Sequence, residues 1–376
     1  MATQRERYRN TILFNNPDRI PLHPGHPRES TLAAWKRQGL PENVDYMDTA
    51  LDELGIDRRA ALRFHSLNVS FKLFPEFEQV ILEHRNGHYV IRDWSGAITE
   101  ISDQYDASYL KTAKDFVTRK WHSFPVKTKA DWEVMKTRYD PKEKARIARD
   151  AYAKCADMAA QDHVISLSFN GIFWQLREWC GFENLCLLMA DDPQLVHEMA
   201  RFWSDFVADM LDIVCRQVTP DRVLISEDMA YKAHSMISPD MTREFILPAY
   251  NAWVPKIKKY GCPIIELDSD GYIGELIPIW IEAGINCCSP VEVAAHCDIL
   301  AFRQNFGKNM AYMQGIDKRI MARGSKDLEE HVMQIVPALF ADGGYIPGCD
   351  HGVPPDISWH NYLDFTRMLA QLSGWL

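Results

Sequence analysis

The chain has 376 residues, of which 47% are hydrophobic and 25% charged, a composition typical of a globular protein with a substantial core. Its net charge of −10, without a Lys/Arg cluster, argues against a nucleic-acid partner. The apolar runs fall short of the roughly 18–20 residues that span a bilayer, so no membrane association is expected. The charged N-terminus lacks a signal region and the nine cysteines lack a disulfide-framework spacing, which predicts reduced thiols and a cytoplasmic location.

The first 160 residues read as an irregular N-terminal part. Its expected elements are a helix at 4–14, a strand at 20–22, a helix from Thr31, a strand at 65–71 and a charged pair of outer helices within 128–160. Between 78 and 100, apolar and polar residues alternate around Asn86-Gly87 and Ser95-Gly96. This alternation about turn-forming pairs predicts a β-hairpin insertion.

From residue 161 onward, short apolar strands alternate regularly with helices. Further strands are expected at 164–169, 223–225, 263–267, 285–287, 310–313 and 345–347, separated by helices that include 240–259, 272–283 and 326–341. Together with those at 20–22 and 65–71 they make eight strands. Eight such units, without a Gly-rich dinucleotide motif, predict an α/β fold of the (β/α)₈ TIM-barrel type. We expect a single domain over 1–376, with 1–160 as the N-terminal elaboration and 161–376 as the regular βα units.

The strand expected at 263–267 ends in acidic residues. Alternation places Glu266 and Asp268 on one face, with Asp270 in the following loop. Carboxylates this close repel one another, and a cation or a shared proton relieves the repulsion. The alternatives are that Asp270 caps the next helix and that Glu266 pairs with a basic residue.

A second chemical cluster follows the last expected strand, as Cys349, Asp350 and His351. Because the carboxyl ends of parallel strands meet at one face of a barrel, we expect His351 and Asp270 to share a pocket. Thiolate, imidazole and carboxylate together suit Zn²⁺. For Cys349 the alternative is a small buried thiol.

Other strand ends carry further candidates. Glu227 and Asp228 follow the strand at 223–225 and are candidates for a general acid or base, whereas an ion pair with Lys232 is the alternative. The expected substrate-binding side chains come from three loops and are His26, Arg28, Asn170, Phe173, Trp174 and Tyr231. For Phe173 and Trp174, a place in the core is an equally open interpretation.

Several short motifs, spread over nearly the whole chain, resemble one known family. They are Arg5-Glu6-Arg7 with Pro17-Asp18-Arg19-Ile20-Pro21, Ala190-Asp191-Asp192-Pro193, Asp270-Gly271, Glu282-Ala283-Gly284, Gly315-Ile316-Asp317 and His351-Gly352-Val353-Pro354-Pro355-Asp356. In these residues the chain resembles the uroporphyrinogen decarboxylase superfamily. The resemblance implies a (β/α)₈ barrel with its pocket at the C-terminal mouth. It also implies one of two activities, decarboxylation in the haem pathway or corrinoid-dependent methyl transfer.

The chain departs from the decarboxylases where they hold the tetrapyrrole. The Arg-rich anchor after the first strand is replaced by 23–28, and the Asp expected after the second strand is absent around Asn68. The resemblance therefore favours the methyltransferase branch, whose members carry zinc on a His-x-Cys and a later Cys. The matching positions here are Asp268-x-Asp270 and His351, with Cys349 beside it.

Replacement of a thiolate-type site by oxygen ligands favours an oxygen-bearing substrate. The resemblance thus implies the methyltransferase of an O-demethylase, which moves a methyl group from a methyl ether, first of all a methoxylated aromatic, to the cobalt of a corrinoid (cobalamin) on a partner protein. Zinc on Asp268, Asp270, Cys349 and His351, or an acid among Glu227, Asp228 and His351, would activate the ether oxygen. A second copy of the chain is a further candidate partner.

Two other functions stay open. One is a metal-free decarboxylase or lyase of the same superfamily, in which Asp270 and His351 steer protonation. The other is a non-catalytic protein that binds a corrinoid or tetrapyrrole. Metal content separates the first from a zinc enzyme, and turnover with a methyl donor excludes the second.

Overall fold

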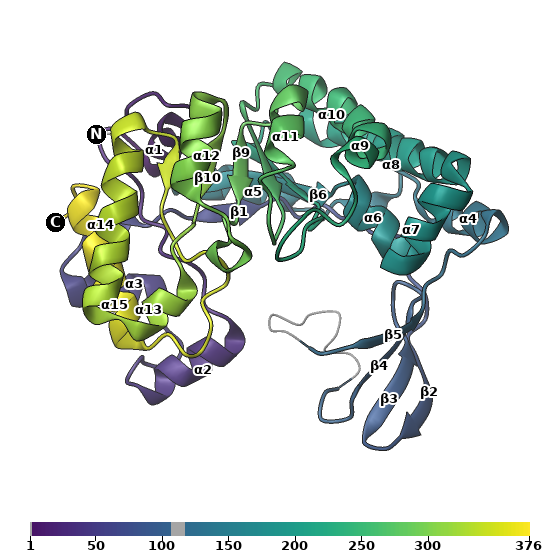
Figure 1. Cartoon of the computed structure of the whole chain (residues 1–376), viewed down its shortest axis with the longest axis horizontal. Helices are drawn as coiled ribbons and strands as arrows, with labels where there is room; N and C mark the ends of the chain where they lie inside the picture. The colour runs from purple at the N-terminus through teal and green to yellow at the C-terminus, as the bar shows by residue number, and fades with distance from the viewer. Residues whose placement is uncertain (1, 107–116) are drawn as a thin grey trace.

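The computed structural model describes residues 2–106 and 117–376, and its centre is a parallel sheet (Figure 1). The sheet has seven strands in the order β1-β6-β7-β8-β9-β10-β11, and every neighbouring pair is parallel. The strands are β1 (Phe64–Ser66), β6 (Val164–Asn170), β7 (Arg222–Ser226), β8 (Ile264–Asp268), β9 (Cys287–Ser289), β10 (Ala311–Met313) and β11 (Tyr345–Ile346). Because consecutive strands along the chain are neighbours in space, their carboxyl ends gather at one face.

The strand expected at 20–22 does not form as a strand. Only Leu22 pairs with β-geometry, in an isolated parallel bridge to Ala61 just before β1. Two residues later, the Pro24 carbonyl accepts a hydrogen bond from the backbone N–H of Cys349, beyond β11, at 3.0 Å. Segment 22–24 therefore lies between the two edge strands of the sheet and is hydrogen-bonded to chain on both sides. The prolines at 21 and 24 explain why no ladder develops, since proline donates no hydrogen bond.

Fifteen α-helices are described, most of which cover the outer face of the sheet. They are α1 (Gln4–Ile12), α2 (Glu29–Arg37), α3 (Tyr46–Leu54), α4 (Lys129–Met135), α5 (Ala151–Ala160), α6 (Ile172–Cys180), α7 (Phe182–Asp191), α8 (Pro193–Cys215), α9 (Pro239–Met241), α10 (Leu247–Lys259), α11 (Ile277–Ala283), α12 (Ile299–Phe306), α13 (Lys318–Arg323), α14 (Ser325–Asp342) and α15 (Trp359–Leu372). Local signals set many ends: the Asp192 side chain caps α8 at Leu195, and Gly284 ends α11 in a left-handed conformation.

Two buried clusters distinguish the faces of the sheet. Outward residues such as Leu167, Val223 and Leu267 pack with the helices in the main core. The inner cluster instead joins Tyr8 and Ile12 of α1 to apolar residues at the amino ends of the strands, including Val164, Ile264, Cys287 and Ala311. Helix α1 therefore plugs the amino end of the strands with apolar contacts. Functional side chains are therefore expected at the opposite, carboxyl end of the strands.

The expected hairpin region forms part of a separate antiparallel sheet of four strands, in the order β2-β3-β4-β5. Its strands are β2 (Val80–Arg85), β3 (His88–Arg92), β4 (Ile98–Ser102) and β5 (Lys120–Ser123), and β2 and β3 flank the turn at Asn86-Gly87. Figure 1 shows this sheet projecting away from the parallel sheet and its helices. Strand β5 lies beyond the predicted range because its partner β4 is far from it in sequence.

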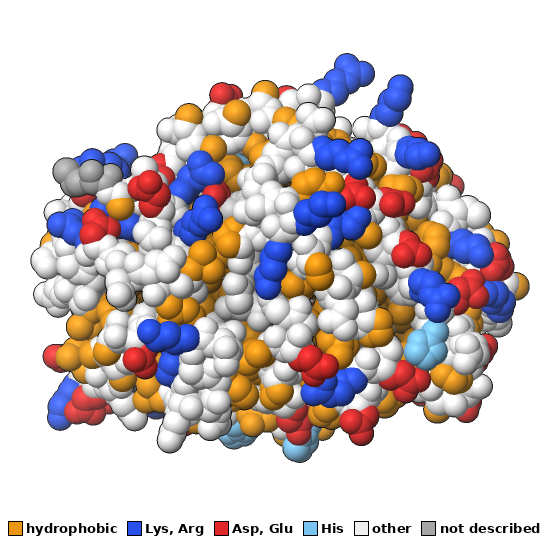
Figure 2. Space-filling model, turned by 90° about the horizontal axis from the view of Figure 1, so that it is seen from above, with side chains coloured by type: hydrophobic (Ala, Val, Ile, Leu, Met, Phe, Trp, Pro, Cys, Tyr) orange, Lys and Arg blue, Asp and Glu red, His pale blue; other side chains and the backbone are white. Residues whose placement is uncertain are grey.

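Two boundaries differ from those expected. The strand predicted at 285–287 is Cys287–Ser289, because the backbone N–H of Ile285 still bonds to Trp280 of the preceding helix. The helix predicted at 272–283 begins only at Ile277. On the face seen in Figure 2, basic and acidic side chains are interspersed. No helix in the described ranges has the length and apolarity needed to cross a membrane.

Candidate functional site at the strand carboxyl ends

Asp270 and His351 meet, although 81 positions separate them in the sequence. Asp270 follows β8 and His351 follows β11, and His351 Nε2 lies 3.1 Å from Asp270 Oδ2. Both side chains are partly exposed, Asp270 more than His351. The juxtaposition predicted from the two strand ends is confirmed. It arises because parallel strands deliver their following loops to the same face.

The orientation of His351 is fixed from its other ring nitrogen. The backbone N–H of Gly352 donates to His351 Nδ1 at 2.7 Å, so the ring proton resides on Nε2 and points to Asp270. The hydrogen bond to Asp270 raises the pKa of His351 above its usual value, and burial of the ring opposes that shift. The pair is therefore an imidazole held in one tautomer against a carboxylate that solvent reaches.

Asp268, the last residue of β8, lies within the same end of the sheet. Ser226 of β7 donates its hydroxyl to Asp268 Oδ2 at 3.3 Å. Burial, reinforced by the nearby Asp270 and Glu266 carboxylates, raises the pKa of Asp268 to about 7. Asp268 is nevertheless only half-buried. It is thus a carboxyl group that is about half protonated near neutral pH and is not sealed from solvent.

Below Asp268, towards the apolar plug, lies a buried ion pair. Glu266 pairs with Arg222 and accepts a hydrogen bond from the Ser289 hydroxyl at 2.6 Å. The Arg222 guanidinium also bonds to Ser166 Oγ at 3.1 Å and stacks over the Phe64 ring at 3.8 Å. The interpretation of Glu266 as the partner of a basic residue is therefore confirmed. Arg222 neutralises the charge of Glu266, and this ion pair lies at the bottom of the polar end of the strands.

Glu227, which follows β7, is fully buried. Its carboxylate accepts the backbone N–H groups of Ile172, Phe173 and Trp174 at the start of α6, and the Tyr250 hydroxyl at 2.7 Å. Burial raises the pKa of Glu227 to about 7, and these hydrogen bonds oppose the shift. A Cβ on Gly171 would lie 2.1 Å from the Glu227 carboxyl carbon, so glycine is required there. In this arrangement Glu227 holds the helix and does not reach a ligand.

Asp228, the neighbouring acid, is paired with Arg177 of α6 at 2.8 Å rather than with Lys232. Arg177 also donates to the Asp228 carbonyl at 2.9 Å. Tyr231, farther along the same loop, is 52% exposed. It lines, with Asp270 and Arg319, a pocket of about 380 Å³ at the rim. Of these residues, Tyr231 is thus placed where a ligand approaching Asp270 would pass.

Of the two aromatic residues expected to bind a ring after β6, Phe173 does not face a ligand. Phe173 is fully buried in the main core, which confirms its alternative interpretation and corrects the predicted binding role. Trp174 donates its indole N–H to Glu178, and the Asn170 amide is bonded to Gln175 and Glu178. Helix α6 starts immediately after β6, so Phe173 in its first turn points into the core, whereas Trp174 is half-buried.

The loop that follows residue 22 places its two candidates differently. His26 is exposed, with Nδ1 2.8 Å from the Tyr46 hydroxyl of α3. Arg28 is the residue that precedes α2, and its backbone N–H bonds to the Val353 carbonyl at 3.2 Å. Both therefore lie beside the segment that carries His351, and their part in substrate binding stays a prediction.

Cys349 does not join His351 as a metal ligand. It is fully buried, its Cβ faces Gly25, and burial raises the pKa of its thiol to about 12, far from a thiolate. Within residues 2–106 and 117–376, no group of three or more His, Cys, Asp or Glu is arranged to hold a metal ion. The four residues predicted to bind zinc thus do not fit a zinc centre in this arrangement.

Asp350, noted in the sequence without a role, connects the loops around the site. It is fully buried and accepts the backbone N–H groups of Val293 and Lys318, each at 3.0 Å. The Lys318 ammonium in turn bonds to Glu292, whose other oxygen accepts the Gly271 N–H beside Asp270. No sequence signal indicated this network, because its members come from four separate loops. Ser226, by contrast, was recognisable from alternation along its strand.

The comparisons with known proteins agree with this architecture. A sequence model of the family described as Uroporphyrinogen decarboxylase (URO-D) matches residues 122–371, more than half of the chain. A methyltransferase from Methanosarcina mazei has a similar structure, with a TM-score of 0.59, 11% identity, and coverage of 98% of this chain and 99% of that one. At this identity the likeness concerns the fold alone.

A B12-independent methionine synthase from Shewanella sp. W3-18-1 aligns more weakly, with a TM-score of 0.39 and 12% identity over 60% of this chain and 68% of that one. That score is too low to support a conclusion. Among curated proteins, no sequence matches the chain significantly.

Proposed function

The chain belongs to the uroporphyrinogen decarboxylase family, and from this premise we propose that it is a methyltransferase that moves a methyl group from a methyl ether to the cobalt of a corrinoid on a partner protein. The observation that carries the proposal is Asp268, a half-buried carboxyl with its pKa raised to about 7, beside the Asp270–His351 pair. An ether is a poor methyl donor at neutral pH because its leaving group is an alkoxide or phenolate. A protonated carboxyl removes that obstacle.

The proposed division of labour uses groups already in contact. A reduced corrinoid supplies the nucleophile that takes the methyl group. Asp268 gives its proton to the ether oxygen as the carbon–oxygen bond breaks, so that a neutral alcohol or phenol leaves. The Asp270 carboxylate keeps the pKa of Asp268 high and, bonded to His351 at 3.1 Å, stays oriented. Glu227 has a positioning role, because it holds the first turn of α6 against β7.

We propose acid catalysis in place of zinc because the predicted ligands do not form a metal centre. The two alternatives differ in a simple measurement. Protein treated with a chelator and containing less than about a tenth of an equivalent of zinc would keep its activity under acid catalysis. A loss of activity restored by zinc would instead establish the metal alternative.

The test of the function itself is methyl transfer from 2-methoxyphenol and other methyl ethers to cobalt(I) cobalamin, followed by absorbance. The expected result is methylcobalamin with an equal amount of demethylated product. No transfer from any ether, with or without zinc, would overturn the proposal. Release of carbon dioxide from a carboxylated substrate, without methyl transfer, would establish the decarboxylase alternative that the family also contains.

A further inference from the structure

The parallel sheet has a gap next to β1, between residues 23–28 and residues 63–66, and we call this gap the seam. Leu22 forms its bridge to Ala61, but beyond it the chain at 23–28 turns to residues 349–353, with three backbone hydrogen bonds of 2.8–3.2 Å. Within the described residues, no backbone hydrogen bond joins 23–28 to 63–66. Backbone hydrogen bonds therefore join segment 23–28 to residues 349–353 but not to the chain at β1.

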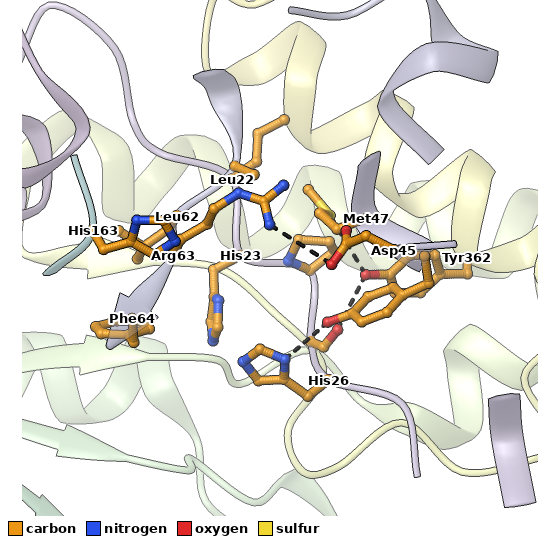
Figure 3. A pocket seen from close by; sticks show the side chains of 14 residues that line it. Leu22, His23, His26, Asp45, Met47, Leu62, Arg63, Phe64, His163 and Tyr362 are labelled. Atoms are coloured by element: carbon orange, nitrogen blue, oxygen red, sulfur yellow. Dashed lines mark hydrogen bonds and ion pairs between the residues drawn. The ribbon is translucent and has the colours of Figure 1, made fainter. Parts of the chain in front are cut away.

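A pocket of about 290 Å³ occupies this seam (Figure 3). It is lined by His23 and by Phe64, whose ring carries the Arg222 guanidinium of the buried ion pair. It is also lined by Arg63, which pairs with Asp48 of α3, and by Tyr46. Side chains of the first segment, of the chain at β1 and of α3 therefore meet around one pocket.

Six of the fourteen residues that line the pocket carry an aromatic ring. The His23 ring meets His26 edge-on, with centroids 4.9 Å apart, and Phe64 likewise at 5.6 Å. Tyr46 and Tyr362 form a further edge-on pair at 6.2 Å. Edge-to-face contact is the arrangement that aromatic rings prefer among themselves. Another flat ring would find the same kind of contact on several sides.

The polar groups of the pocket are uncharged or already neutralised. His23 is 8% exposed and makes no hydrogen bond through its imidazole within the described residues, and His163, which lines the same pocket, has a buried Nδ1 without a partner there. Burial lowers the pKa of His23 well below its usual value, so the ring is neutral and offers one donor and one acceptor. Arg63 is balanced by Asp48 and by Asp45, the latter at 3.7 Å. The pocket therefore lacks a net charge with which to hold an ion.

We propose that the seam pocket binds an uncharged single-ring aromatic molecule whose oxygen substituent hydrogen-bonds to His23. A cavity of about 150 Å³ holds benzene. The seam, at about 290 Å³, therefore has room for one substituted ring. The site does not depend on methyl transfer. Only the identification of its ring with that of the methyl donor rests on the proposed function.

The test measures binding of 2-methoxyphenol to the full chain by titration calorimetry, with toluene as the probe that lacks oxygen. His23→Phe keeps a ring and removes the hydrogen bond, and His360→Phe, on the exposed face of α15, is the matched control. We expect His23→Phe to weaken 2-methoxyphenol about tenfold, as one lost hydrogen bond requires, and to leave toluene within about twofold. No binding by the wild type, or equal binding by both variants, would overturn the proposal.

A crystal soaked with 4-iodophenol keeps the proposal falsifiable if His23→Phe fails to fold. Iodine signal between His23 and Phe64 supports the site, and signal elsewhere alone overturns it. Methyl-transfer assays then separate the two proposals. A raised KM for 2-methoxyphenol in His23→Phe identifies the bound ring as the methyl donor, whereas an unchanged KM with weakened binding identifies a separate aromatic ligand. Binding without any turnover contradicts the proposed function alone.

Discussion

The ends of β7 and β8 place two carboxyl groups in opposite situations. Glu227 after β7 and Asp268 at the end of β8 both have a pKa raised to about 7 by burial. Glu227 accepts four hydrogen bonds and is fully buried, whereas Asp268 accepts the Ser226 hydroxyl and is half-buried. A raised pKa therefore does not by itself identify an acid catalyst. The number of donors and the access of ligand decide between a structural and a chemical role.

The largest expected effect is on the reaction. Asp268→Asn keeps the size of the side chain and removes its proton, so we expect methyl transfer to fall about 100- to 10,000-fold. Stability should be unchanged or slightly higher, because the like charges of Asp268 and Asp270 no longer repel. Single-turnover absorbance assays and urea unfolding measure the two quantities. Activity within about threefold of wild type would remove Asp268 from the proposed chemistry.

Glu227→Ala is expected to act on stability instead. It leaves three backbone N–H groups and the Tyr250 hydroxyl without their acceptor, which should lower the free energy of unfolding by about 3 kcal/mol. The comparison is sharpened by Glu78→Ala, whose side chain is exposed and whose effect should be within about 0.5 kcal/mol. A Glu227→Ala protein as stable as wild type would contradict the role assigned to the carboxylate.

The ends of β7 and β8 also show what the sequence could and could not predict. The meeting of Asp270 and His351 followed from strand order, because parallel strands bring their carboxyl ends together whatever the details of packing. The burial of Glu227 did not follow. It depends on where α6 begins relative to β7, a tertiary relation that leaves no local signal.

The same distinction applies to the fold. The interior strands, such as β7 and β8, were predictable because apolar runs bounded by turn residues leave few alternatives. The first segment was not, since Ile20-Pro21-Leu22 is apolar like a strand yet pairs only through Leu22. Cys349 shows the limit for site residues: its position after β11 was correct, but its side chain faces Gly25. Side-chain direction beyond a strand end is set by packing rather than by alternation.

The pH dependence of stability offers an intermediate test. Asp268 has a folded-state pKa of about 7, above the ordinary value of 3.8, so the folded protein binds more protons between these pH values. Stability contributed by this group is therefore highest below about pH 4 and is lost as pH rises to about 7. Asp268→Asn should show a smaller loss over this interval in urea titrations. A parallel pair of stability profiles would show that the pKa of Asp268 is not raised.

The smallest expected effect concerns Asp228, the residue directly after Glu227. It pairs with Arg177 at 2.8 Å with both side chains partly exposed, so Asp228→Asn should cost about 0.5–1 kcal/mol in urea unfolding. Arg177 would keep its bond to the residue 228 carbonyl and its position over Trp174, which limits the loss. Methyl transfer should stay within about threefold of wild type, because the Asp228 carboxylate is already engaged by the Arg177 guanidinium. A loss of activity as large as that of Asp268→Asn, at unchanged stability, would instead move the acid role from the end of β8 to the end of β7.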